Sequence, residues 1–463
     1  MAKIIPGKKA CATNPLKMSA PIGAALAFLG MDKALPVLHG SQGCTAFGLV
    51  LFVRHFRETI PLQTTAMNEV TTILGGLDNV EQAVLNIKKR ADPALIGICS
   101  TGITEAKGDD LGGFIKLIRE RHPELEGTEI VFASTPDFSG GFSDGWSKAV
   151  TAMIDALVVP TRVQTPWQVN ILAGCHLTTA DIEEIREMVE SFGLTPIILP
   201  DLSGSLDGHI PETFLPHTLG GTTVADVKRM GASAFTIALG DAMRPAAERL
   251  EKKTGVSFRV FETLTGLAAN DAFISLLSDI SENEVPSKYK RQRSQLQDAM
   301  LDGHFHFGEQ KVAIAAEPDL LYSLSKFFAD MGAEVVAAIA PQDAKILEQV
   351  AAETVRIGDL QDFEDTAADS GAALLVTHSH GRQAAARLGL PLFRAGIPTF
   401  DRLGASHRVS VGYRGTRNLI FEVGNVFLEQ LEQHEQALNS PAGPIELHRR
   451  PETSVDAPAV TGH

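Results

Sequence analysis

Several features that mark other protein classes are scarce or absent in this chain of 463 residues. It holds only 4 cysteines, widely spaced and without a Cys-x-x-Cys pair, which disfavours a disulfide-stapled fold and suits a reducing cytoplasm. No stretch approaches ~18 uncharged apolar residues, so we expect no membrane span. Lys and Arg number 41 against 56 Asp and Glu, a formal charge of −15, which argues against general nucleic-acid binding. The basic N-terminus is followed by no apolar segment with a cleavage site, so we expect a cytoplasmic protein.

Motifs of the commonest catalytic and nucleotide-binding sites are missing as well. The sequence contains no G-x-x-x-x-G-K-[ST] phosphate loop, no G-x-G-x-x-G fingerprint, no H-E-x-x-H and no nucleophile elbow. Each of these patterns supplies backbone or side-chain groups that its chemistry requires. We therefore expect no complete active site within this chain alone.

The pattern that is present indicates an α/β protein. Apolar runs of four to eight residues alternate with amphipathic helical stretches, which is typical of parallel sheets flanked by helices. We expect three Rossmann-like domains, over 1–165, 166–308 and 309–437, and a disordered tail over 438–463 that mixes Pro, charge and small residues. The expected strands are 94–101, 129–135, 168–174, 196–199, 235–240, 311–316, 334–340, 373–377 and 391–394, and the clearest helices are 111–122, 319–331 and 419–433.

Cys44 lies in the most informative segment, the glycine-punctuated turn VLHGSQGCTAF. Gly40 and Gly43 allow a tight bend and a close approach to a bulky neighbour. A helix predicted to begin at Cys44 would direct unpaired N–H groups at the sulfur and favour the thiolate, which suits metal binding. No second cysteine lies nearby, so a four-cysteine site cannot be assembled from this segment. Either Cys44 is an ordinary buried thiol or another chain supplies the missing ligands.

Long motifs in the chain resemble the β-type subunits of nitrogenase-like proteins. The resemblance begins with LHGSQGCTAFGLVLFVRHFR (Leu38–Arg57) and covers about residues 5 to 435. Within that superfamily the chain is most similar to the β-type subunit of the scaffold that matures the iron–molybdenum cofactor. The further matching stretches are PLQTTAMNE, GDDL, TPDFSGGF, PDLSGSLDGH, YKRQRSQLQDAMLD and HSHGRQAAARLGLPLFRAGIPTFDRLG.

The resemblance also implies which cysteines bind metal. The catalytic β subunit offers three cysteines to a double cluster at the subunit interface. Here Cys11 and Cys44 fall at the first two of these positions, but the third falls near Gly102, and Cys99 lies three residues earlier. Loss of one ligand is expected for a scaffold with a simpler [4Fe–4S] cluster, held by three cysteines of an α-type partner and by one from this chain. Cys44 is the candidate for that ligand.

The resemblance implies a scaffold role and several partners. With an α-type subunit in an α₂β₂ heterotetramer, this chain would hold the cofactor precursor, mainly through the α-type subunit, while molybdenum and homocitrate are added. The precursor would arrive from a radical-SAM protein, the nitrogenase iron protein would take part, and the product would pass to apo nitrogenase component 1. The alternatives are the β subunit of a nitrogenase or a nitrogenase-like reductase, including a vanadium-system paralogue, and a metal-free α/β binding protein.

Two further groups of basic residues invite a functional interpretation. Arg54 and Arg57 flank His55 after the apolar helix, on one face, and either meet an anionic cluster or a partner's carboxylates or form a solvated helix end. His378 and His380 follow a predicted strand, where α/β proteins often bind ligands. For this pair we favour a structural turn.

A helix rich in Lys, Arg and Gln is predicted over 287–302. It has few large apolar residues to bury, so a solvated helix is one interpretation. Because two β-type subunits meet in the family's tetramer, the other is a polar β–β contact. Arg291 and Arg293 are the residues whose charge we expect to matter there.

Overall fold

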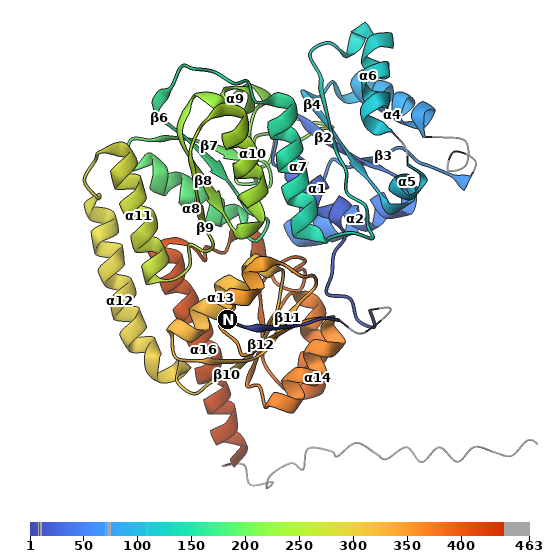
Figure 1. Ribbon diagram of the computed structural model, residues 1–463. Coiled ribbons are helices and arrows are strands. Elements are labelled where there is room, and N and C mark those ends of the chain that lie inside the picture. Colours follow the sequence, from blue (N-terminus) through green and yellow to red (C-terminus); the bar gives the residue numbers. More distant parts are fainter. Residues whose placement is uncertain (8, 10–11, 70, 72–75, 109, 439–463) are drawn as a thin grey trace, which may run out of the picture.

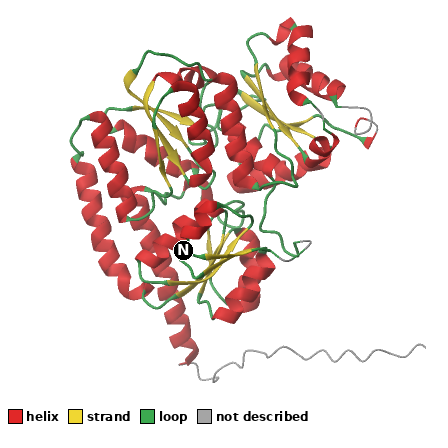
Figure 2. Cartoon of the chain, viewed as in Figure 1, coloured by secondary structure: helices red, strands yellow, loops and turns green. Residues whose placement is uncertain are grey.

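The computed structural model describes residues 1–438 except 8, 10–11, 70, 72–75 and 109. Three parallel β-sheets are each flanked by helices, as Figures 1 and 2 show. This confirms the α/β class and the three Rossmann-like units. The expected disordered tail lies outside the described residues apart from Leu438, the last residue of the final helix. No membrane-spanning helix is found in the described part of the chain.

The first sheet has the strand order β3-β2-β4-β5. Every residue of β2 and β4 is buried, as expected for strands covered by helices on both faces. Gly97 is required in β4 because a Cβ atom there would lie 2.3 Å from the Phe28 ring. The strands are β2 (Ala34–His39), β3 (Gln63–Thr64), β4 (Leu95–Ser100) and β5 (Glu129–Ala133), and the helices are α1 (Ala20–Leu29), α2 (Gln42–Phe56), α4 (Leu77–Ala91), α5 (Gly102–Lys107), α6 (Leu111–Arg121) and α7 (Phe142–Leu157).

The second sheet has the order β7-β6-β8-β9. Thr178 caps the helix that follows β6, because its hydroxyl accepts a hydrogen bond from the Asp181 N–H at 2.9 Å. The strands are β6 (Thr165–Leu172), β7 (Thr195–Leu199), β8 (Ser233–Leu239) and β9 (Phe258–Phe261), and the helices are α8 (Thr179–Glu190), α9 (Val224–Arg229), α10 (Arg244–Thr254), α11 (Leu267–Ser281) and α12 (Ser287–Phe307).

The third sheet has six strands in the order β1-β12-β11-β10-β13-β14. Gly332 follows the first helix of this unit with φ +91, the left-handed conformation expected at a helix end. The strands are β1 (Lys3–Ile5), β10 (Lys311–Ala315), β11 (Glu334–Ala340), β12 (Thr354–Ile357), β13 (Leu374–Thr377) and β14 (Leu392–Arg394), and the helices are α13 (Pro318–Asp330), α14 (Leu360–Ser370), α15 (Arg382–Leu388) and α16 (Gly412–Leu438). Short 3₁₀ turns are η1 (Pro123–Leu125), η2 (Met230–Ala232), η3 (Asp241–Met243), η4 (Lys345–Gln349), η5 (Ser379–Gly381) and η6 (Ala405–His407).

The start of the chain belongs to the third sheet. Strand β1 pairs in parallel with β12, with Lys3 opposite Thr354. Farther along, the Thr13 N–H donates to the Asp359 carboxylate at 2.7 Å. The sequence interpretation placed these first residues with the domain 1–165. A strand of three residues is too short for its sequence to show which distant sheet edge it joins. The division of the remaining chain near residues 165 and 308 stays our proposal.

Helix α16 joins the third unit to the second. It packs against α12, α11 and α8, and the α12–α16 pair runs along one side of the molecule (Figure 1). One apolar core extends through all three units, from Phe28 through Phe192 to Phe328. The three units therefore meet through packed side chains at a common junction.

Candidate functional site

Cys44 lies at the third residue of α2, in its first turn. The helix begins at Gln42 and not at Cys44, because Ser41 takes the extended conformation of an N-cap residue. The Cys44 side chain is exposed, so the buried-thiol interpretation is wrong. The Ser41 hydroxyl lies 3.4 Å from the sulfur. The thiol is therefore presented outward beside the unpaired N–H groups of a helix start.

The two glycines of the turn differ in how much space surrounds them. A Cβ atom on Gly40 would lie 2.6 Å from the Thr101 hydroxyl, so only glycine fits there without displacement. At Gly43 a Cβ atom would meet nothing closer than the Ser41 hydroxyl, at 3.9 Å. The expected close approach is thus confirmed for Gly40 alone.

Helix α2 exposes apolar side chains next to Cys44. Phe47, Val50 and Val53 are 65%, 52% and 40% exposed. We call Cys44, Phe47, Val50 and Val53 the α2 strip. Exposed apolar side chains that gather in this way mark interaction surfaces more often than isolated ones do.

Cys99, the other cysteine of the first domain that the structure describes, does not complete a metal site with Cys44. Cys99 lies inside β4, fully buried, and burial raises the pKa of its thiol. Gly102 begins α5, where its N–H donates to the Asp137 carboxylate at 3.0 Å. Cys11 lies outside the described residues. Among the residues that the structure describes, no group of three His, Cys, Asp or Glu side chains is placed to hold a metal ion, so Cys44 has no co-ligands there.

The basic residues at the end of α2 contact the third domain. The Thr399 N–H donates to His55 Nδ1 at 2.9 Å, and burial lowers the pKa of this imidazole to about 4. The Arg54 guanidinium lies 3.8 Å from the centroid of the Phe400 ring, and Arg57 donates to the Phe400 carbonyl at 2.9 Å. These side chains thus pack on a loop of the same chain, which neither sequence interpretation anticipated.

His378 and His380 form a structural turn, as we favoured. The His380 N–H donates to the His378 ring nitrogen at 3.3 Å, and the two rings stand 5.2 Å apart, edge to face. Burial is the main cause that lowers the pKa of His378, to about 3. We therefore interpret His378 as an uncharged imidazole that caps the turn by accepting the His380 N–H.

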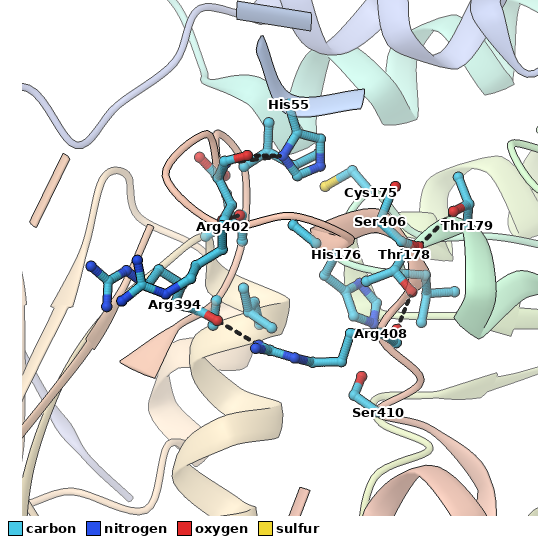
Figure 3. Close-up of a pocket in the computed structure, with 18 of the residues that line it drawn as sticks. His55, Cys175, His176, Thr178, Thr179, Arg394, Arg402, Ser406, Arg408 and Ser410 are labelled. Atoms are coloured by element: carbon cyan, nitrogen blue, oxygen red, sulfur yellow. Dashed lines mark hydrogen bonds between the residues drawn. The ribbon is translucent and has the colours of Figure 1, made fainter. Parts of the chain in front are cut away.

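A cavity of about 120 Å³ lies where the three units meet. Figure 3 shows His55 from α2 on one side of it and Cys175 and His176, which follow β6, on another. Glu317, which follows β10, also lines it. Sequence reasoning missed this cavity because its residues come from distant segments. The available signal was a polar residue soon after a buried strand, at the sheet edge where α/β proteins bind ligands.

Comparisons with known proteins agree with this fold. The model of the family described as nitrogenase component 1 type oxidoreductase matches residues 19–428. The protein named nitrogenase iron-molybdenum cofactor biosynthesis protein NifN of Bradyrhizobium diazoefficiens is 56% identical over 439 residues, 94% of each chain. The protein of the same name from Nostoc is 50% identical, over 93% of this chain and 97% of its own.

A solved nitrogenase structure, titled "Nitrogenase Cp1 at pH 6.5", superposes with a TM-score of 0.88. It is 31% identical and covers 93% of this chain and 96% of its own. The match extends over all three sheets, so it concerns the whole architecture and not one domain. The chain belongs to the nitrogenase component 1 type oxidoreductase family, and its relatives within that family include the NifN cofactor biosynthesis proteins.

Proposed function

We propose that this chain is the β-type subunit of a scaffold on which the nitrogenase iron–molybdenum cofactor precursor is held and matured. The observation that carries the proposal is near full-length similarity to proteins named for the biosynthesis of this cofactor. Molybdenum and homocitrate would be added on the scaffold before the product passes to the apo catalytic component. The precursor would be held mainly by the α-type subunit.

Cys44 is the proposed ligand of a [4Fe–4S] cluster shared between the two subunits. The donor chemistry fits, since thiolates bind iron–sulfur clusters and this thiol is exposed at a helix start. A single cysteine without described co-ligands supplies one corner of such a cluster, and three cysteines of the α-type subunit would supply the others. Free thiolates need a reducing compartment, so we place the complex in the cytoplasm.

The α2 strip is the proposed contact with the α-type, NifE-like subunit. Its apolar side chains follow the cluster ligand along α2, and a partner that covers this part of the helix would bury the cluster between two chains. Two such pairs would form the α₂β₂ heterotetramer. The transient partners in this scheme are the radical-SAM protein that builds the cofactor core, the nitrogenase iron protein and apo nitrogenase component 1.

A second candidate is the β subunit of a nitrogenase or nitrogenase-like reductase, including a vanadium-system protein. The fold match to a solved nitrogenase favours it. The ligand set argues against it, because Gly102 stands near the third cysteine position of the double cluster.

Iron content and the electron-paramagnetic spectrum of the complex, purified under argon, separate these functions. A [4Fe–4S] signal together with a larger precursor cluster supports the scaffold. The signature of a double cluster at the subunit interface supports the nitrogenase, and a complex without iron contradicts both.

A further inference from the structure

Three neighbouring strands of the first sheet end at one edge, and an exposed apolar side chain follows each of them. Strand β4 pairs in parallel with β2 on one side and with β5 on the other. Neighbouring strands lie about 4.8 Å apart, so the segments that follow them lie side by side, and Figure 1 shows α2 and α5 at the same end of this sheet. Phe47 follows β2, Ile103 follows β4 and Phe138 follows β5, and the last two are 45% and 70% exposed.

Hydrogen bonds hold Ile103 next to the end of β2. The Thr101 hydroxyl donates to the His39 carbonyl at 2.8 Å, and the Thr104 hydroxyl donates to the same carbonyl at 3.3 Å. Both threonines are buried, and they flank Ile103 in the sequence. The first turn of α5 is therefore attached to the last residue of β2.

The segment that carries Phe138 is attached to the same helix start. The Gly102 N–H donates to the Asp137 carboxylate at 3.0 Å, so Phe138 and Ile103 each lie one residue from a partner in this hydrogen bond. A surface whose segments are held in place before binding loses less conformational entropy on association. We call Ile103 and Phe138 the edge pair.

The edge pair lies beside the turn that presents Cys44. Gly40, in that turn, is so close to Thr101 that a Cβ atom would lie 2.6 Å from its hydroxyl. Cys44 has no co-ligand among the residues that the structure describes, so we expect a cluster bound there to draw its remaining ligands from a second chain at this edge. Exposed apolar side chains that gather at one place mark interaction sites, and here they continue the α2 strip past the turn.

We propose that the edge pair belongs to the contact with the α-type subunit, which then spans α2, α5 and the segment after β5. This inference rests on the proposed function, because it takes the α-type subunit as the partner. Apolar side chains would then lie on both sides of Cys44, and an apolar shell of this kind limits the access of water to a metal site. The facing surface of the partner is accordingly apolar.

Site-specific photo-crosslinking tests this contact in the complex of the full-length chain with its co-expressed α-type partner. With p-benzoylphenylalanine in place of Phe138, irradiation should join this chain to the α-type subunit. The matched control carries the same group in place of Val163, which is 73% exposed and precedes β6 at the amino end of the second sheet, and it should give no such product. Crosslinking of Phe138 to a second copy of this chain, or none to the α-type subunit, would overturn the proposal.

A buried charge provides a second test. Phe138→Asp and Ile103→Asp change exposed side chains, so the unfolding midpoint should stay unchanged. Each should raise the concentration at which the two chains assemble at least about tenfold in sedimentation experiments. Val163→Asp should assemble like the unaltered chain. Unchanged assembly in both edge-pair variants contradicts the contact.

The iron content of the same complex separates this inference from the proposed function. A complex that crosslinks through Phe138 but holds no iron keeps the contact and contradicts the scaffold. A complex with a [4Fe–4S] signal that does not crosslink there contradicts the edge pair alone.

Discussion

The Ser41 hydroxyl lies 3.4 Å from the Cys44 sulfur in the first turn of α2. Ser41 stands at the N-cap position of the helix, so the residue that precedes the first turn also contacts the exposed thiol. No co-ligand for this thiol lies among the residues that the structure describes, so we expect a cluster bound there to draw its remaining ligands from another chain. An exposed side chain contributes little to the stability of the fold. A ligand role for Cys44 can therefore be distinguished from a packing role by experiment.

The first prediction concerns Cys44→Ala. Removing one of four thiolates should leave one iron open to exchange, so the complex should lose or alter its [4Fe–4S] signal. Unfolding free energy should change by no more than about 0.5 kcal/mol, because the side chain is exposed. Iron analysis, electron-paramagnetic spectra and denaturant unfolding measure these effects.

Cys175→Ala is the matched control for that prediction. Cys175 is buried beside the interdomain cavity, so its truncation should cost about 1 kcal/mol and leave the iron content unchanged. Equal iron and identical spectra in both variants would show that Cys44 is no ligand. The scaffold function could then still rest on the α-type partner.

The second prediction concerns the α2 strip. Expressed without its α-type partner, the chain should aggregate, because Phe47 and Val50 stay exposed and an obligate interface commonly buries more than ~2,000 Å². Phe47→Asp should make the isolated chain more soluble and should also prevent assembly with the partner. Size-exclusion chromatography of the single and the co-expressed chains measures both effects. A monodisperse, stable monomer of the unaltered chain would count against the interface.

The third prediction concerns the β–β contact proposed for α12. Arg293 turns out to form a double hydrogen bond with the Asp271 carboxylate, with both distances 2.8 Å. Its reversal would therefore disturb the chain itself and cannot test the contact. Arg291 is exposed, so Arg291→Glu should dissociate the tetramer into αβ dimers in sedimentation experiments. Lys252→Glu provides the control on a distant helix, and an unchanged tetramer in Arg291→Glu would refute the contact.

Much of the fold could be predicted from local sequence. Buried strands such as 94–101 and 311–316 are apolar runs, and helical stretches follow them along the chain in the alternation typical of α/β proteins. Thr178 marks a helix start by its own hydroxyl. Those signals lie within a few residues of the elements that they specify. The candidate metal ligand also rests on a local signal, because Cys44 lies within one short motif.

What could not be predicted depends on contacts between distant segments. Nothing near Lys3 indicates that β1 pairs with β12, and nothing near His55 indicates that its ring accepts a hydrogen bond from Thr399. The interdomain cavity is the extreme case. Its lining residues His176 and Glu317 follow strands of two different units, and they line one cavity only after both sheets have formed.

The last prediction concerns Glu317 and pH. Burial, the largest cause, raises the pKa of this carboxyl to about 7, and the charges of Asp144 and Asp319 add to the rise, while hydrogen bonds from Ser143 oppose it. Because the pKa in the folded chain exceeds the ordinary value of 4.5, Glu317 favours the folded state when it is protonated. That contribution is complete below about pH 4.5 and is lost as the pH rises through about 7.

Glu317→Gln cannot ionise, so its unfolding free energy should fall less than that of the unaltered chain over this window, by about 1–3 kcal/mol. Urea unfolding at several pH values measures the difference. Asp319 also has a pKa raised to about 7, mainly by burial, so part of the slope should persist in the variant. Parallel pH profiles for the two proteins would show that Glu317 ionises as freely in the folded chain as in water.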